Sequence, residues 1–215
     1  MYHDAKTTVF YMLQDLAFVP ISVLLVSLII NRLLNIMEMR KKLKKINVII
    51  STFFIESGTE MLFEFSKFNK NHLSCCNILK INDITNKKES EIKKLVNECK
   101  FEMYADPEKL QSLAKLMADN KTFMINMLEN SNLLEHDSFT DMIWAVFHVG
   151  DELRSRDHFS SLSVDDITHI SSDILRAYTA MISEWVNYLK YLHKEYPFLY
   201  ALAIKKNPFC INELN

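Results

Sequence analysis

The chain has 215 residues, 49% of them hydrophobic and 24% charged, so it can bury a core and lacks the composition of a disordered protein. It contains only two glycines, Gly58 and Gly150. Because tight turns use glycine, this scarcity predicts an all-α protein and excludes the glycine-rich P-loop and G-x-G-x-x-G nucleotide-binding turns. Residues 1–45 carry seven basic and three acidic side chains, whereas residues 46–215 carry 18 basic and 24 acidic side chains. An acidic domain of this kind is a poor nucleic-acid binder.

The first predicted element is a transmembrane anchor over residues 9–36, preceded by a short extracytoplasmic tail at 1–8. Residues 16–31 (LAFVPISVLLVSLIIN) carry no charge, and a spanning helix needs about 20 mostly apolar residues. Pro20 is expected to bend this helix without preventing it. A cleaved signal peptide and a buried core helix are the alternatives, although the start of the chain (MYHDAK) is not basic and no A-x-A-like site follows.

A basic juxtamembrane stretch over residues 37–45 follows the anchor. Its membrane-surface residues are Arg40, Lys41, Lys42, Lys44 and Lys45. Basic residues gather on the cytoplasmic side of a span and attract anionic headgroups. We therefore expect a single-pass cell-membrane protein with its N-terminus outside, its basic stretch on an anionic bilayer surface, and residues 46–215 in the cytoplasm.

The four cysteines have neither the spacing of a zinc site nor that of a disulfide framework. They are Cys75, Cys76, Cys99 and Cys210. Reduced thiols in a cytosolic domain are the simplest interpretation.

The domain at 46–215 is predicted to be an antiparallel bundle of four to five helices. Apolar residues recur at helical spacing over 46–68, and residues 69–85 are polar and aperiodic, as in a loop. Further helices are expected at 86–104, from Asp106-Pro107 to about 130, and from Asp137 or Ser138 onwards. Ser163 and Asp166 have the spacing of a capping box and begin the longest helix, which Pro197 ends. Residues 198–206 are expected to close the bundle as a short apolar helix.

An acidic ladder in this domain is the first candidate site. Glu56, Glu60 and Glu64 are spaced four residues apart on one side of a predicted helix. Like charges so placed repel by a few tenths of a kcal/mol per pair, so solvent, a metal, a proton or basic side chains must offset them. We predict that burial increases from Glu56 to Glu64 and that Glu60 or Glu64 pairs with Arg154 across the bundle.

Two further polar groups complete the candidate cluster. His148, Asp151, Glu152 and Arg154 lie close together on one helix, where Asp151 could orient the His148 imidazole. Glu184 lies at the border of the core on the last long helix, where it could meet Arg154 or Arg176. The polar flank of that helix comprises His169, Asp173, Arg176, Glu184 and Asn187. An ordinary network of ion pairs at helix ends explains the same residues.

The spacing of acids and histidines argues against a di-iron centre, which uses Glu-x-x-His twice. No glutamate here precedes a histidine by three residues. We therefore expect no metal and no cofactor. The role that we expect is interaction or sensing at the membrane through a protein partner, without catalysis. The alternatives are a carboxylate- and histidine-containing enzyme or metal-binding bundle, and a structural homo-oligomer.

Overall fold

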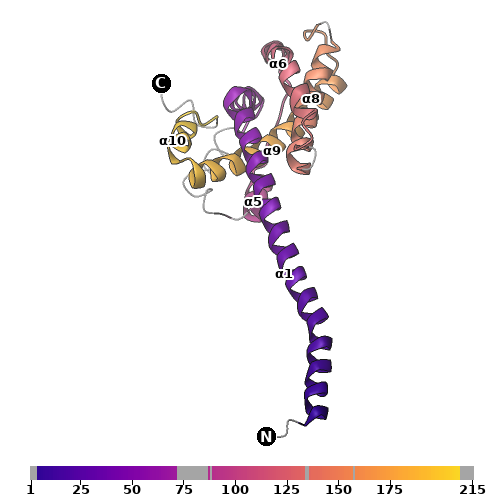
Figure 1. Ribbon diagram of the computed structural model, residues 1–215. Coiled ribbons are helices and arrows are strands. Elements are labelled where there is room, and N and C mark those ends of the chain that lie inside the picture. Colours follow the sequence, from indigo (N-terminus) through magenta and orange to yellow (C-terminus); the bar gives the residue numbers. More distant parts are fainter. Residues whose placement is uncertain (1–3, 72–86, 88, 134–135, 157, 209–215) are drawn as a thin grey trace. The chain divides into compact units, whose positions relative to one another are not determined.

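The computed structural model describes residues 4–71, 87, 89–133, 136–156 and 158–208. Within these residues the regular elements are helices, and pairing of the strand type is confined to one isolated bridge between Asn69 and Met103. The all-α prediction is confirmed (Figure 1). Cys75, Cys76, Cys210 and most of the expected loop at 69–85 lie outside the described residues.

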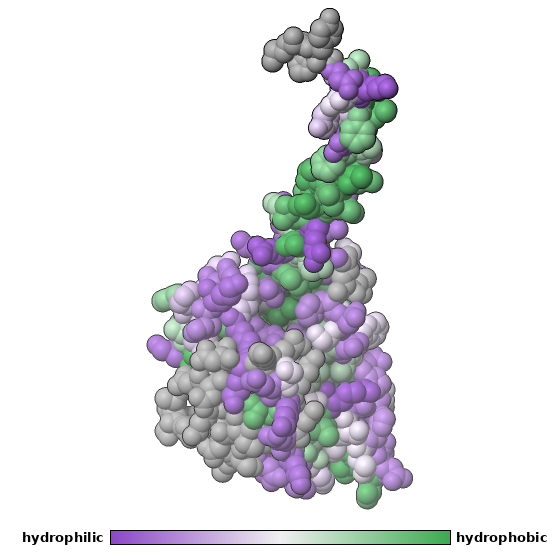
Figure 2. Space-filling view, turned by 90° about the horizontal axis from the view of Figure 1, so that it is seen from below, coloured by the Kyte–Doolittle hydropathy of each residue, from purple (hydrophilic) through white to green (hydrophobic). Residues whose placement is uncertain are grey.

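The chain divides into two compact units, Met1–Lys45 and Ile46–Asn215. Helix α1 (Ala5–Phe53) contains Pro20 and supplies the described helical residues of the first unit. Within the helical run Ala5–Ser66, one apolar window of 18 residues has none of its residues buried, and its length and composition would allow it to cross a membrane. In Figure 2 the side chains of this apolar segment form a green, hydrophobic surface.

The second unit begins with the end of α1, a five-residue π-helical segment η1 (Phe54–Gly58) and α2 (Thr59–Ser66). The Thr59 hydroxyl donates a hydrogen bond to the carbonyl of Phe54, five residues earlier, at 2.7 Å. Gly58 fits this wider turn closely, because a Cβ there would lie 2.7 Å from Cδ1 of the Phe53 ring. The Phe53 ring therefore packs directly against the backbone of Gly58 in the π-helical segment.

The middle of the chain forms shorter helices than the sequence predicts. They are α5 (Glu89–Glu98), α6 (Pro107–Asp119) and α7 (Lys121–Leu128). Asp106 caps α6 by accepting a hydrogen bond from the Glu108 N–H at 3.1 Å, and Pro107 follows as expected. The prediction of a single helix from 107 to about 130 is wrong, because α6 is capped at its C-terminus by Asn120. The side-chain amide of Asn120 donates a hydrogen bond to the carbonyl of Leu116 at 2.9 Å.

The two longest helices that lie wholly in the second unit are α8 (Asp137–Arg154) and α9 (Val164–Glu195). His136 caps α8 by accepting a hydrogen bond from the Phe139 N–H at 3.3 Å. Ser163 and Asp166 form the predicted capping box at the start of α9. In Figure 1, α9 runs past α8 at one end and α10 at the other. Helices α2, α5, α8 and α10 all pack on α9, which is the central element of this unit.

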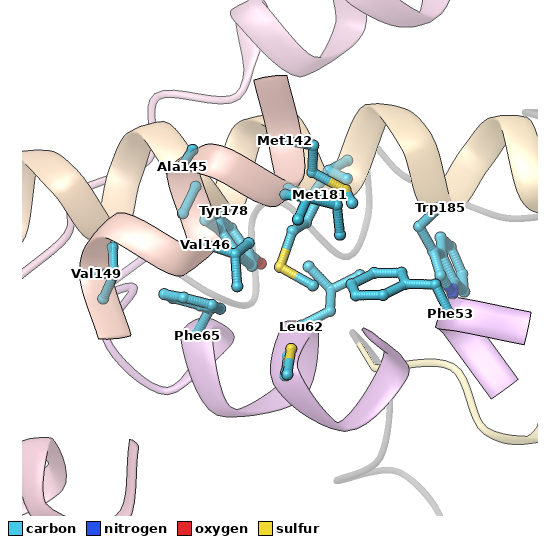
Figure 3. Packing of buried hydrophobic residues seen from close by; sticks show 14 of the residues in the cluster. Phe53, Leu62, Phe65, Met142, Ala145, Val146, Val149, Tyr178, Met181 and Trp185 are labelled. Atoms are coloured by element: carbon cyan, nitrogen blue, oxygen red, sulfur yellow. The ribbon is translucent and has the colours of Figure 1, made fainter. Parts of the chain in front are cut away.

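The core lies where α2, α8 and α9 meet. Figure 3 shows Phe53, Leu62 and Phe65 pointing toward side chains of α8 and α9, among them Val146 and Met181. The Phe53 and Phe139 rings meet edge to face at 5.5 Å between centroids. Close approach also occurs at Gly150 of α8, where a Cβ would lie 3.1 Å from Cβ of Met117 on α6.

Helix α10 (Pro197–Lys205) forms as expected and packs on α9, but it contributes no fully buried residue. Phe198 is 76% exposed, and Leu199 and Leu202 are also exposed. Tyr200, Ala203 and Ile204 on the same helix are partly buried against the core, and α10 packs on α9. The expectation of a short apolar helix that packs on the bundle at 198–206 is therefore confirmed, with one side of the helix left exposed.

Candidate functional site

The acidic ladder does not converge with the other candidate residues. Glu56 and Glu60 are exposed, and Glu64 is half-buried, so burial is greatest at Glu64 as predicted. Glu64 forms an ion pair with Lys67, three residues along the chain, and accepts a hydrogen bond from the Ser112 hydroxyl of α6 at 3.3 Å. These contacts satisfy the carboxylate locally.

The predicted pairing of Glu60 or Glu64 with Arg154 is wrong. Arg154 forms its ion pair with Asp151, on the preceding turn of α8. Helix α2 packs on α6 and α9, so the group from another helix that reaches Glu64 comes from α6. Two residues three apart on one helix already lie within reach of each other, and this local geometry decides both pairs.

Asp151 pairs with Arg154, and His148 lies beside Asp173. Glu184 lies on the same side of α9 as Asp173, but about three helical turns further along the helix. Glu184 is 3% exposed, between core positions of α9. The arginines expected near Glu184 have other acidic partners: Asp151 for Arg154, and Asp173 for Arg176, the latter at 3.0 Å. The expectations that Asp151 orients His148 and that Arg154 or Arg176 pairs with Glu184 are therefore corrected.

Of the eight predicted cluster residues, His148 and Glu152 lie on α8 where it packs against α9. There they lie next to Asp173 and His169 of α9. His148 Nε2 lies 3.4 Å from Oδ2 of Asp173, and Glu152 Oε1 lies 3.6 Å from Nε2 of His169. His169 Nε2 also lies 3.4 Å from the same Oδ2 of Asp173. Each helix contributes a histidine followed four residues later by an acid. Because the first residue of the α8 pair lies next to the second of the α9 pair, and the second next to the first, α8 and α9 run antiparallel here.

Asp173 is the centre of this group. Its side chain is only 9% exposed, whereas those of His148 and His169 are 47% and 58% exposed. Arg176 donates a hydrogen bond to its Oδ1, but among the described residues no donor makes a hydrogen bond to its buried Oδ2. An unsatisfied buried acceptor costs about 1–3 kcal/mol, and more when it is charged. Both imidazole nitrogens therefore lie next to the one oxygen of this carboxylate that lacks a hydrogen-bond donor.

A second arginine, Arg156, forms an ion pair with Glu152 at the other end of this group. Arg156 lies 2.7 Å from Oε1 of Glu152 and 3.3 Å from Oδ1 of Asp166. Burial lowers the pKa of Arg156, but hydrogen bonds and charge from Glu152 and Asp166 outweigh it, so its pKa is raised overall. The pKa of Asp166 is lowered, mainly by hydrogen bonds from Ser163 and further by Arg156. Arg156 thus links the end of α8 to the start of α9 through ion pairs with Glu152 and Asp166.

One donor atom from each of His148, His169 and Asp173 lies within 4.8 Å of the other two. Two imidazole nitrogens and one carboxylate oxygen are donors suited to a divalent transition metal. The same atoms can form ion pairs when the imidazoles are protonated. We name the group formed by His148, Glu152, His169 and Asp173 the α8–α9 polar site.

The sequence prediction missed His169 and Asp173 as site residues and placed them only on the flank of the last long helix. A signal for them exists: His-x-x-x-acid occurs at 148–152 and again at 169–173. Residues four apart share a helix face, and two such pairs on antiparallel neighbours can meet. The Glu-x-x-His template of di-iron proteins does not detect this spacing.

Comparisons with known proteins identify relatives along most of the chain. Residues 42–205 match the family described as "Uncharacterized protein MJ1433, C-terminal helical domain", and residues 1–34 match "MJ1433, N-terminal helical domain". The "Uncharacterized protein MJ1433" of Methanocaldococcus jannaschii is 42% identical over 202 residues, which cover 93% of this chain and 80% of that protein. No solved structure matches. Since the C-terminal domain family alone matches more than half of the chain, this protein belongs to the MJ1433 family of helical proteins.

Proposed function

We propose that this protein is a single-pass membrane protein whose cytoplasmic helical domain binds or senses a protein partner. The observation that carries the proposal is the apolar window of 18 residues in the N-terminal helix, none of which is buried. Apolar side chains on every face of a helix are stable in lipid and costly in water. A buried core helix is disfavoured because none of the residues of this window is buried among the residues that the structure describes.

The proposed orientation depends on the exposed basic residues after the apolar segment. Arg40, Lys41, Lys44 and Lys45 are all exposed. Each basic residue near an anionic headgroup contributes about 1 kcal/mol, and such residues resist translocation. The bilayer partner is therefore a membrane with anionic headgroups on its cytoplasmic side.

Cysteine labelling tests this topology. With the native cysteines replaced by alanine, Tyr2→Cys is expected to react with a membrane-impermeant maleimide on intact cells. Lys206→Cys is expected to react only after permeabilisation. Labelling of Lys206→Cys on intact cells would overturn the orientation, and release of the chain into the soluble fraction by carbonate would overturn the anchor.

Charge neutralisation tests the role of the basic stretch. Replacing Arg40, Lys41, Lys42, Lys44 and Lys45 by glutamine is expected to produce a mixed population in the labelling assay, with no change in the helical content of the domain. The matched control neutralises three exposed lysines of the second unit, Lys94, Lys115 and Lys194, and is expected to leave orientation unchanged.

The interaction surface that we favour is α10. Tyr196, Phe198, Leu199 and Leu202 expose large apolar side chains on this short helix and its cap. Contiguous exposed apolar side chains mark interaction sites more often than free surface. Two lysines, Lys205 and Lys206, end the surface and would suit a partner with acidic groups beside its apolar contact.

Photocrosslinking in cells tests this surface. A photoreactive residue at Phe198 is expected to give one discrete adduct that Leu202→Asp abolishes, whereas the same group at exposed Lys194 gives none. An adduct of twice the chain mass would favour the homo-oligomer over a separate partner. Absence of any adduct from Phe198 would contradict an interaction through α10.

A further inference from the structure

We propose that the α8–α9 polar site is a binding site for a divalent transition metal ion, with His148, His169 and Asp173 as its protein ligands. This inference revises the expectation that the protein binds no metal. It is independent of the membrane placement, because it depends only on the contact between α8 and α9.

The distances fit tetrahedral coordination. Zinc lies about 2.0–2.2 Å from imidazole nitrogen and carboxylate oxygen, so two ligand atoms at neighbouring corners of a tetrahedron are about 3.3–3.6 Å apart. Nε2 of His148 and Nε2 of His169 each lie 3.4 Å from Oδ2 of Asp173. The three ligand atoms lie within 4.8 Å of one another, and the two imidazoles that would have to adjust on metal binding are about half exposed.

The buried carboxylate is the second, independent observation. Asp173 is 6% exposed, and its Oδ2 has no hydrogen-bond donor among the described residues although two imidazoles face it. Arg176 donates to the other oxygen, Oδ1, at 3.0 Å and so fixes the orientation of the carboxylate. A ligand oriented in this way by a neighbouring group is a common feature of protein metal sites.

The fourth position is open to solvent. Glu152 Oε1 lies 2.7 Å from Arg156 but 3.6 Å from Nε2 of His169, so its arginine already neutralises it. His148 and His169 are about half exposed, which lets water reach a metal bound between them. Three protein ligands and a water molecule form the arrangement seen in zinc sites that act on substrates, whereas structural zinc sites are closed by four protein ligands.

The experiment uses the full chain, purified in detergent without a histidine tag and treated with chelator. Cobalt(II) is the spectroscopic probe and zinc(II) the competitor. We expect one metal ion per chain and visible d–d absorption from cobalt that zinc abolishes. His148→Ala and His169→Ala are each expected to weaken zinc binding by about 100-fold or more, since even groups that only orient ligands contribute about 10–100-fold.

Three comparisons make the result decisive. His158→Ala, which removes an exposed histidine outside the site, is expected to bind metal like the unmodified chain. Asp173→Asn keeps the size of the buried side chain and is expected to lose affinity as the histidine variants do. Circular dichroism should show that the two histidine variants remain folded, because both side chains are about half exposed.

Two results would overturn the proposal. One is zinc affinity in the His148→Ala, His169→Ala double variant equal to that of the unmodified chain. The other is failure of the chelator-treated chain to bind zinc or cobalt stoichiometrically. In NMR spectra, zinc should shift the imidazole resonances of two histidines, and these should be the resonances missing from the His148 and His169 variants.

Discussion

The apolar stretches 9–36 and 46–68 have similar side chains but opposite surroundings. In the first, Phe18, Leu24 and Leu28 are each at least 64% exposed. In the second, Phe53, Met61 and Phe65 have no measurable exposure. The comparison shows that an apolar helical pattern predicts removal from water, but does not say whether lipid or protein replaces the water.

Matched substitutions in the two stretches can break or sharpen this comparison, with unfolding followed in the full chain in detergent. Trp185 is 1% exposed in the core and reports unfolding of the second unit, while Trp144 is 54% exposed. A Trp144→Phe background therefore isolates the buried probe.

The largest effect is expected from a pair of phenylalanines on the same helix, α1. Phe53→Ala removes a fully buried ring that meets Phe54, Phe123 and Phe139, and should lower the free energy of unfolding by about 3–5 kcal/mol. Phe18→Ala removes a ring that is 64% exposed and should leave unfolding of the second unit unchanged. Denaturant titration of Trp185 fluorescence measures both, and equal effects would contradict the division into a buried and an exposed stretch.

The next effect concerns Gly58 in the π segment. Gly58→Ala places a Cβ against the Phe53 ring, and such overpacking costs about 1–3 kcal/mol. The higher helix propensity of alanine offsets about 1 kcal/mol of that cost, so we expect a net loss of about 0–2 kcal/mol. Ser27→Ala, at an exposed position of α1, is the control and should not change the denaturation midpoint. A more stable Gly58→Ala would show that the ring moves aside freely.

A smaller effect is expected at helix starts. Ser163 accepts a hydrogen bond from the Asp166 N–H at 3.1 Å, and Ser163→Ala should cost about 1 kcal/mol near neutral pH. The counterpart in the first unit is Asp4, which accepts from the Lys6 N–H at 3.2 Å. Asp4→Ala should not alter thermal unfolding of the second unit.

The Ser163 contact also has a defined dependence on pH. Hydrogen bonds from Ser163, and then Arg156, lower the pKa of Asp166 in the folded state. Its contribution to stability is therefore present above the usual aspartate pKa, about 3.9, and is lost as pH falls through the lower folded value. The difference between Ser163→Ala and the unmodified chain should shrink in that acidic range, and a difference that grows in acid would contradict the assignment.

The smallest effect is expected for Glu64. Its partner Lys67 has a side chain that is 38% exposed, and exposed ion pairs contribute about 0–1 kcal/mol. Glu64→Gln should therefore cost less than about 1 kcal/mol, and Glu38→Gln in α1 should cost nothing measurable. A double-mutant cycle should be additive for Glu64 with Arg154 and non-additive for Glu64 with Lys67. Coupling to Arg154 would restore the pairing that the structure contradicts.

Local signals of the sequence predicted local features well. The scarcity of glycine predicted an all-α protein, and Asp106-Pro107 and Ser163–Asp166 predicted the starts of α6 and α9. These signals succeed because capping hydrogen bonds join residues two or three positions apart, so the neighbouring sequence contains both partners. The break at Asn120 escaped prediction because the apolar spacing continues across it from α6 into α7.

The partners of the polar side chains were decided by the tertiary structure. Helical periodicity places Glu64, His148 and Asp173 on particular faces, but it does not say which helix each face meets. Packing of α2 on α6 brought the Ser112 hydroxyl to Glu64, whose ion-pair partner Lys67 is local, and antiparallel packing of α8 on α9 set His148 against Asp173. The sequence alone determined the all-α class and the starts of α6 and α9, because these depend on neighbours along the chain. The α8–α9 polar site needed the fold, because its charges come from two helices whose register is set by the packing of the core.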